Sequence, residues 1–148
     1  MIKNFNIALL GGRGYVGQEI VKLINDHPNF LLKQAFSSSS SGDKVPNYTK
    51  NKNLSYSLLS TNNMDLKNID IVILALPNNE SYKYVETIRK VSSTIIILDL
   101  SSDHRFEDRW AYRVPEVHDH DLNVNISNPG CYATAMQLSV APIINLVK

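Results

Sequence analysis

Short, almost wholly apolar runs alternate with longer amphipathic stretches along this chain. The run NIALL at residues 6–10 is followed by glycines, and the run IDIVILAL at 69–76 ends at Pro77. Such short apolar runs are typical of parallel strands that are buried on both faces. The same pattern predicts further strands at residues 31–36, 94–100 and 124–127, and a less regular one at 54–59.

Amphipathic stretches between these runs predict helices. In residues 17–26 apolar side chains recur at helical spacing, and the stretch ends before Pro28. Further helices are predicted at 79–90 and 131–146, with a loop at 101–123. Strand–helix alternation with apolar strands predicts one α/β domain over residues 1–148, with a mainly parallel, Rossmann-like, doubly wound sheet.

A glycine-rich segment, GGRGYVG at residues 11–17, joins the first predicted strand to the first predicted helix. Glycines here allow a tight turn and a close approach of the backbone to a pyrophosphate, and the helix N-terminus supplies N–H donors. The alternative is a turn that only lets a strand and a helix pack closely. The order of strand, glycines and helix favours dinucleotide binding.

The end of the second predicted strand bears on which dinucleotide binds. An NAD site usually has an Asp or Glu about 20 residues after the glycine loop, where it holds the ribose 2′-OH. Here the strand ends in Ser37 and Ser38, and the first carboxylate is Asp43. These hydroxyls, with Lys44 nearby, favour a 2′-phosphate and therefore NADP(H). A plain solvated serine loop is the alternative.

The single cysteine, Cys131, follows the turn Asn128-Pro129-Gly130 and begins the last predicted helix. The dipole and free N–H groups of a helix N-terminus stabilise a thiolate, which is the nucleophilic form of the side chain. A buried structural cysteine is the alternative. The glycine loop favours the nucleophile, because a cysteine beside a nicotinamide indicates thioester and hydride chemistry.

Composition and charge limit the class of protein. Hydrophobic residues make up 43% of the chain, charged residues 20%, and the net charge is +1. These values are ordinary for a globular protein, so we expect no nucleic-acid or membrane partner. No apolar run approaches the roughly 20 residues of a membrane helix, and no signal peptide precedes the first strand. One cysteine excludes an internal disulfide and fits a reducing compartment.

Several segments together resemble the N-acetyl-γ-glutamyl-phosphate reductases. They are GGRGYVGQE at 11–19, ALP at 75–77, DLSSDHRF at 99–106, WAYRVPE at 110–116 and SNPGCYATAMQ at 127–137. They occur in the order of the family and at similar spacing, and the resemblance covers nearly the whole chain. The combination of DLSSDHRF with NPGCYAT is highly specific. Aspartate-semialdehyde dehydrogenases share the general fold and mechanism but carry a different cysteine motif.

The resemblance implies NADPH-dependent reduction of N-acetyl-γ-glutamyl phosphate in arginine biosynthesis. Cys131 would attack this small-molecule acyl phosphate, phosphate would leave a thioester, and hydride would yield N-acetylglutamate semialdehyde. It also implies a homo-oligomeric enzyme in the cytoplasm or, alternatively, the mitochondrial matrix. A reductase for a related acyl phosphate, of aminoadipate or aspartyl type, is one alternative. A non-catalytic NADP-binding module is another, which the complete cysteine motif disfavours.

The resemblance further assigns residues to parts of the site. The expected pyrophosphate residues are Gly11, Gly14, Tyr15, Val16 and Gly17. Ser37 and Ser38 would face the 2′-phosphate, and Leu76 and Pro77 would lie under the cofactor. The residues expected near Cys131 and the substrate are Ser101, Arg105 and Asn128. Arg105 is a candidate clamp for an anionic group, and an ion pair with Asp103 or Asp108 is its alternative.

The chain departs from the family at two points that matter for function. Ser38 stands where the family usually has an arginine, which Lys44 would have to compensate. Family chains are about twice as long, consistent with a second, α+β substrate domain. That domain, with the general-base histidine, is absent here, so we expect this chain alone to be inactive.

Histidines offer one further candidate site. His118 and His120 alternate with acidic residues at 119 and 121, but this pattern in a polar loop is more typical of a solvated segment than of a metal site. We therefore expect no metal. None of the histidines matches the catalytic histidine of the family.

Overall fold

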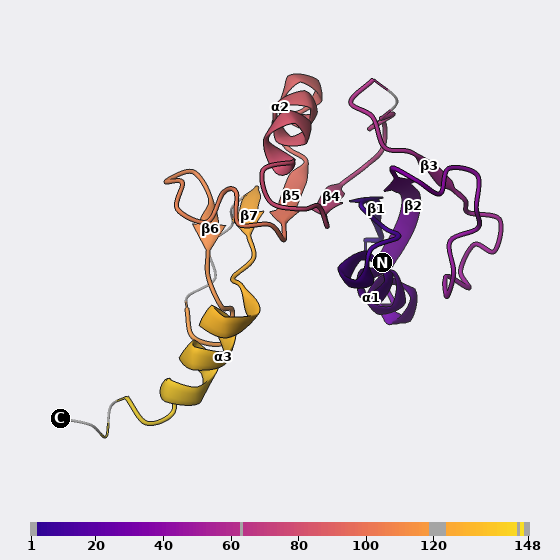
Figure 1. Ribbon diagram of the computed structural model, residues 1–148. Helices are drawn as coiled ribbons and strands as arrows, with labels where there is room; N and C mark the ends of the chain where they lie inside the picture. The colour runs from indigo at the N-terminus through magenta and orange to yellow at the C-terminus, as the bar shows by residue number, and fades with distance from the viewer. Residues whose placement is uncertain (1–2, 63, 119–123, 145, 147–148) are drawn as a thin grey trace.

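The computed structural model describes residues 3–62, 64–118, 124–144 and 146. Their strands are β1 Phe5–Leu10, β2 Phe30–Ser37, β3 Tyr56–Leu58, β4 Ile71–Leu74, β5 Ile96–Asp99, β6 Ala111–Tyr112 and β7 Asn125–Ser127. Their helices are α1 Tyr15–Asp26, α2 Ser81–Val91 and α3 Cys131–Val140. The strands form one sheet in the order β3-β2-β1-β4-β5-β7-β6. Each neighbouring pair is parallel, which confirms the predicted fold class (Figure 1).

Alternate side chains of β1 enter two separate hydrophobic clusters. Leu9 packs in the cluster that contains Val21 of α1, and Leu10 packs in the cluster that contains Ile88 of α2. All four side chains are buried. Since successive side chains of a strand point to opposite faces of the sheet, α1 and α2 cover opposite faces. The sheet is therefore doubly wound (Figure 1).

The winding direction of the sheet changes between β1 and β4. The chain passes from β1 outward to β2 and β3, and then returns to β4 on the other side of β1. In an open parallel sheet, ligands bind in the crevice beyond the carboxyl ends of the strands at such a switch point. Here that crevice lies between the glycine loop, which follows β1, and residues 75–77, which follow β4.

The second half of the chain differs from the predicted elements. β6 lies within the segment predicted as a loop, and its two residues are too few to leave a periodic pattern. The helix predicted to end at residue 146 ends at Val140, and none of its ten residues is buried. Figure 1 shows α3 projecting away from the sheet. Within the described residues, no helix combines the length and apolar character needed to cross a membrane.

Candidate active site

A cleft of about 490 Å³ opens at the switch point of the sheet. Most of its lining comes from three segments that are distant in sequence: the glycine loop, the serine loop (residues 37–41) and residues 75–77. Gln18 of α1 and Leu59, which follows β3, complete the lining. The predicted cofactor residues that meet in this lining are Gly11, Gly14, Tyr15, Ser37, Ser38, Leu76 and Pro77. Val16, which is exposed, and Gly17, which is buried, belong to the first turn of α1 beside the cleft.

Two glycines of the loop are required by the packing of the chain itself. Gly11 has a φ of 83°, and a Cβ atom there would lie 2.1 Å from the carbonyl oxygen of Ala75. A Cβ atom at Gly17 would lie 2.3 Å from the carbonyl oxygen of Gly11. These glycines therefore let α1 and the loop after β4 approach the glycine loop closely.

The packing of the chain does not require a glycine at position 14. Its φ is −61°, and the nearest atom to an added Cβ would be the Gly11 carbonyl oxygen at 3.5 Å, an ordinary contact. Gly14 also lines the cleft. The open space here fits a ligand that approaches the backbone at the N-terminus of α1, as a pyrophosphate does.

We expect Gly14→Ala to separate binding from folding. A methyl group that overlaps a bound pyrophosphate should cost about 1–3 kcal/mol, or about 5- to 150-fold in dinucleotide affinity. The free energy of unfolding should fall by less than about 1 kcal/mol, because only the N-cap preference changes. NADPH titration measures the affinity, and urea denaturation measures the stability, of the wild-type chain and of Gly14→Ala. Unchanged affinity would place the dinucleotide elsewhere.

The serine loop is held against the glycine loop by backbone hydrogen bonds. The carbonyl oxygen of Phe36 accepts from the N–H groups of Gly11 and Gly12, both at 3.0 Å. The Oγ of the buried Ser37 accepts from the N–H of Ser39 at 3.3 Å. The hydroxyls predicted to bind a 2′-phosphate therefore lie directly beside the predicted pyrophosphate loop.

Arg13 is a residue of this cleft that the sequence reasoning missed. Its Nη1 donates to the Oγ of Ser39 at 2.9 Å, and both residues line the cleft. The signal was present in the sequence, because Arg13 is a cation inside a phosphate-binding loop. Lys44, the cation expected to help, instead donates to the carbonyl oxygen of Asn53 and pairs with Ser55. It is not among the residues that line the described cleft.

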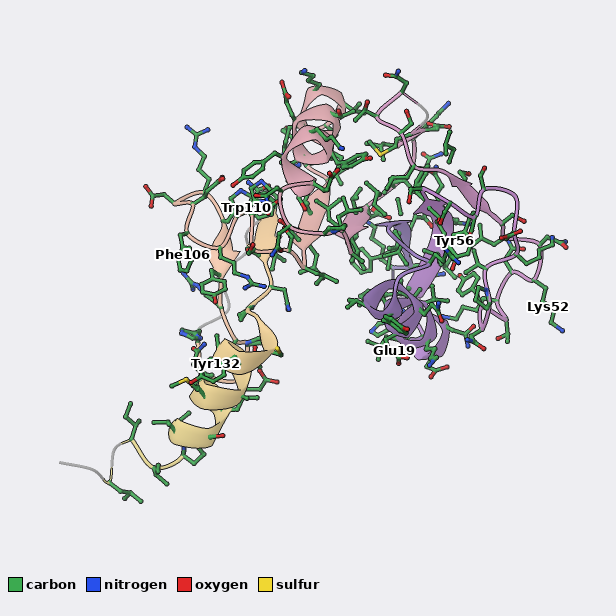
Figure 2. The ribbon with its side chains drawn as sticks, viewed as in Figure 1. Glu19, Lys52, Tyr56, Phe106, Trp110 and Tyr132 are labelled. Carbon is green, nitrogen blue, oxygen red and sulfur yellow. The ribbon has the colours of Figure 1, made fainter. Side chains whose placement is uncertain are left out.

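A second group of polar residues surrounds Asp99, at the carboxyl end of β5. The carboxylate is fully buried and accepts hydrogen bonds from Ser81 Oγ (2.9 Å), Ser101 N (3.0 Å), Ser101 Oγ (2.9 Å) and His104 Nδ1 (2.6 Å). The His104 ring stacks on Trp110, with 4.1 Å between ring centroids. These contacts fix the segment from Asp99 to Arg105 against the core (Figure 2 shows Trp110).

Asp103 lies in this segment, but its side chain binds the N-terminus of the neighbouring helix, α2. Its carboxylate accepts from the N–H groups of Asn79 (2.7 Å) and Ser81 (3.0 Å), which caps the N-terminus of α2. The described residues contain no ion pair of Arg105 with Asp103 or with the exposed Asp108. The alternative interpretation of Arg105 as half of a structural ion pair therefore lacks support.

Arg105 instead lies beside the cysteine turn. A Cβ atom at Gly130 would be 3.0 Å from Arg105 Nη1, so the guanidinium covers the backbone just before Cys131. Within the described chain, Arg105 Nε is buried without a hydrogen-bond partner. Cys131 is exposed at the first position of α3. Cys131 thus begins α3 directly after a glycine that the Arg105 guanidinium covers, at the carboxyl edge of the sheet.

The other predicted substrate residues lie at the same edge. The N–H of Asn128 donates to the carbonyl oxygen of Asp99 at 2.8 Å, and its Nδ2 donates to that of Pro129 at 2.9 Å. Ser101 is only 3% exposed, and its hydroxyl donates to Asp99. Both residues therefore bind Asp99 at the end of β5, and the Ser101 hydroxyl is already bound within the protein.

The histidine segment considered as a metal site is described only in part. His118 Nδ1 lies 3.1 Å from the carbonyl oxygen of Val114. The alternating residues 119–121 lie outside the described residues. Among those that are described, no three His, Cys, Asp or Glu side chains gather in a way that could hold a metal ion.

The position of the cleft and the space left by Gly14 define a dinucleotide-binding domain of the doubly wound class. Comparison with known proteins narrows this assignment. The chain belongs to the family described as "Semialdehyde dehydrogenase, NAD binding domain", which matches residues 6–124. This membership agrees with the predicted cofactor class.

Relatives with similar sequences include reductases and mitochondrial proteins. An N-acetyl-gamma-glutamyl-phosphate reductase of Xanthomonas oryzae pv. oryzae is 36% identical over 97% of this chain and 47% of its own length. Protein arg11, mitochondrial, of Schizosaccharomyces pombe is 40% identical over 98% of this chain and 17% of its own. The similarity to the Xanthomonas reductase confirms the resemblance. The chain spans about half the length of the bacterial relative and less of the mitochondrial one.

Solved structures with a similar fold are more distant in sequence. Aspartate semialdehyde dehydrogenase II of Vibrio cholerae superposes with a TM-score of 0.77 at 18% identity, over 97% of this chain and 47% of that one. The enzyme of Candida albicans, solved with NADP, gives 0.77 at 16% identity, over 97% and 48%. At this identity the likeness supports the fold.

Proposed function

We propose that this chain is the cofactor-binding and nucleophile-bearing part of an NADPH-dependent N-acetyl-γ-glutamyl-phosphate reductase. The observation that carries the proposal is the placement of Cys131 at the first residue of α3, with the Arg105 guanidinium over Gly130. A thiol at a helix N-terminus, one residue after a glycine covered by a guanidinium, has the surroundings of a nucleophile. The similarity to named reductases supports the choice of substrate.

In the proposed reaction, the Cys131 thiolate attacks the carbonyl carbon of the acyl phosphate. A C–S bond forms, the bond from carbon to the phosphate oxygen breaks, and phosphate leaves with the electron pair. NADPH, when bound, supplies the hydride that reduces the resulting thioester. Collapse of the thiohemiacetal breaks the C–S bond, releases N-acetylglutamate semialdehyde and returns the thiolate of Cys131.

The neighbours of Cys131 have separate proposed roles. The guanidinium of Arg105 suits the phosphate or carboxylate of the substrate, because its fork can bind two oxygens. Asn128 is a proposed substrate contact in the same turn. Ser101 positions the loop that carries Arg105, since its own hydroxyl is bound to Asp99. We propose that a second region of the protein supplies the general base and the contacts between subunits of a homo-oligomer. This region would correspond to the part of the relatives that the present chain does not match.

The proposed compartment is the cytoplasm or the mitochondrial matrix. The relatives include bacterial reductases and proteins named as mitochondrial. Fusion of the chain to a fluorescent protein, imaged in its own cells, separates these alternatives.

The experiment that tests the activity is phosphate-dependent NADP reduction, which is the proposed reaction in the reverse direction. The 148-residue chain is mixed with NADP, phosphate and N-acetylglutamate semialdehyde, and NADPH formation is followed beside Cys131→Ser. Because the general base is proposed to lie outside this chain, we expect at most slow NADPH formation from the chain alone, and none from the variant. Equal NADPH formation by both proteins would exclude Cys131 as the nucleophile. A chain that binds NADPH but forms no product would support a partial enzyme that needs its substrate domain.

A matched substrate series tests the acyl group. Aspartate semialdehyde and the aminoadipate-derived semialdehyde replace the N-acetylglutamate compound under identical conditions. We expect the N-acetylated substrate to react fastest. Faster reaction with aspartate semialdehyde or with the aminoadipate-derived semialdehyde would indicate a reductase for that acyl phosphate instead.

A further inference from the structure

We propose that Arg13 binds the 2′-phosphate of NADP(H), together with the hydroxyls of the serine loop, and thereby sets the preference for NADP(H) over NAD(H). This inference rests on the proposed function, because it specifies which dinucleotide the cleft accepts. It also replaces an expectation from the sequence, in which Lys44 was to supply the positive charge.

The position of Arg13 relative to the serine loop is the first observation. Arg13 belongs to the glycine loop after β1, yet its Nη1 donates to the Oγ of Ser39, beyond the end of β2, at 2.9 Å. In doubly wound domains, the residue that recognises the ribose 2′ position lies at the end of the second strand. The guanidinium therefore reaches that position from the neighbouring loop.

The charge of the cleft is the second observation. Among the described residues that line it, Arg13 is the only charged one, and none is a carboxylate. An NAD site normally offers a carboxylate to the 2′-OH, and a carboxylate there would repel a 2′-phosphate. A single cation among serine hydroxyls suits the phosphate instead, because guanidinium–phosphate pairs form charge-assisted, bidentate hydrogen bonds.

The number of donors on Arg13 also allows this role. A guanidinium has five N–H donors, and the hydrogen bond to Ser39 uses one of them. The side chain can therefore keep its contact with Ser39 and still present donors to a phosphate in the cleft. Ser38, which stands where the resembled family usually has an arginine, lies in the same lining. Arg13 thus supplies from one loop the cation that the other loop lacks.

The backbone around Arg13 is fixed before any ligand binds. The hydroxyl of the buried Tyr56, from β3, donates to the carbonyl oxygen of Gly12 at 3.1 Å. The N–H groups of Gly11 and Gly12 both donate to the carbonyl oxygen of Phe36 at the end of β2. Figure 2 shows Tyr56 at the β1–β2 side of the molecule. Such preorganisation lowers the ordering cost of binding.

The test compares dinucleotides that differ only at the 2′ position. The 148-residue chain, Arg13→Gln and Arg13→Lys are titrated with NADPH, NADH, 2′,5′-ADP and 5′-AMP. Arg109→Gln, which removes an exposed arginine outside the cleft, is the matched control. For Arg13→Gln we expect NADPH and 2′,5′-ADP to bind about 10- to 150-fold more weakly. Binding of NADH and 5′-AMP should change by less than about threefold, and Arg13→Lys should retain part of the preference.

Two results would overturn the inference while leaving the proposed function intact. One is NADPH affinity that is unchanged in Arg13→Gln. The other is an equal loss for NADPH and NADH, which would place Arg13 at the pyrophosphate or in the fold. A wild-type chain that melts cooperatively but binds neither dinucleotide would overturn both the inference and the proposed function.

Discussion

Gly11→Ala is expected to lower the free energy of unfolding by about 2–6 kcal/mol, a large part of the roughly 5–15 kcal/mol typical of a domain. The first cause is the backbone, because a φ of 83° is strained for any residue with a Cβ atom. The second is steric, since the new methyl group would lie 2.1 Å from the carbonyl oxygen of Ala75. Backbone atoms on both sides cannot rotate away, so the loops after β1 and β4 must separate.

Gly42→Ala is the matched control for this prediction. Gly42 also has a positive φ, 93°, but an added Cβ atom would meet nothing within 4 Å. It should show only the backbone strain, of about 1–3 kcal/mol. Urea denaturation gives the free energy of unfolding of both variants, and the difference between their losses of stability is the steric contribution. Equal destabilisation would mean that the close approach to Ala75 does not contribute to stability.

Asp99→Ala is expected to destabilise the chain by about 3–5 kcal/mol, because each buried donor that loses its acceptor costs about 1–3 kcal/mol. The carboxylate is completely buried and accepts four hydrogen bonds, so its loss leaves donors of Ser101 and His104 without an acceptor and Ser81 Oγ with only Ser101 Oγ, at 3.1 Å. Because His104 stacks on the single tryptophan, Trp110, the fluorescence of that residue should change in the folded variant as well.

Two further variants serve as controls for the loss of stability expected in Asp99→Ala. Asp108→Ala removes an exposed carboxylate from the same loop and should change stability by less than about 0.5 kcal/mol. Asp99→Asn keeps the volume but replaces one acceptor oxygen by a donor, so it should fall between the two. Denaturation with tryptophan fluorescence as the signal measures all three. An Asp99→Ala protein as stable as Asp108→Ala would contradict the importance of this network.

The parts of the molecule that were predictable from sequence are those whose signal is local. Each apolar strand is a contiguous run, and residues 11–17 hold a complete phosphate-binding turn in seven positions. Parallel pairing then follows from the alternation of strands and helices. For this reason the sheet and most of the cofactor cleft agree with expectation. β6 was missed because two residues carry no periodicity.

The parts that sequence reasoning missed depend on side chains far apart in the chain. The bond from Arg13 to Ser39 spans 26 positions, and the one from Ser81 to Asp99 spans 18. Nothing in the local pattern specifies such partners, because they depend on which strand ends become neighbours. The position of Lys44 was misjudged for the same reason: closeness in sequence to the serine loop did not bring it to the cleft.

The exposure of α3 has a consequence for the timing of the chemistry. Isolated helices shorter than about 12–15 residues are marginal in water, and this one has ten residues, none of them buried. Its amide hydrogens should therefore exchange with solvent faster than those of α1 or α2. The helix N-terminus at which Cys131 lies exists only while the helix is formed. Cys131 is accordingly expected to hold a fixed position only for the part of the time in which α3 is formed.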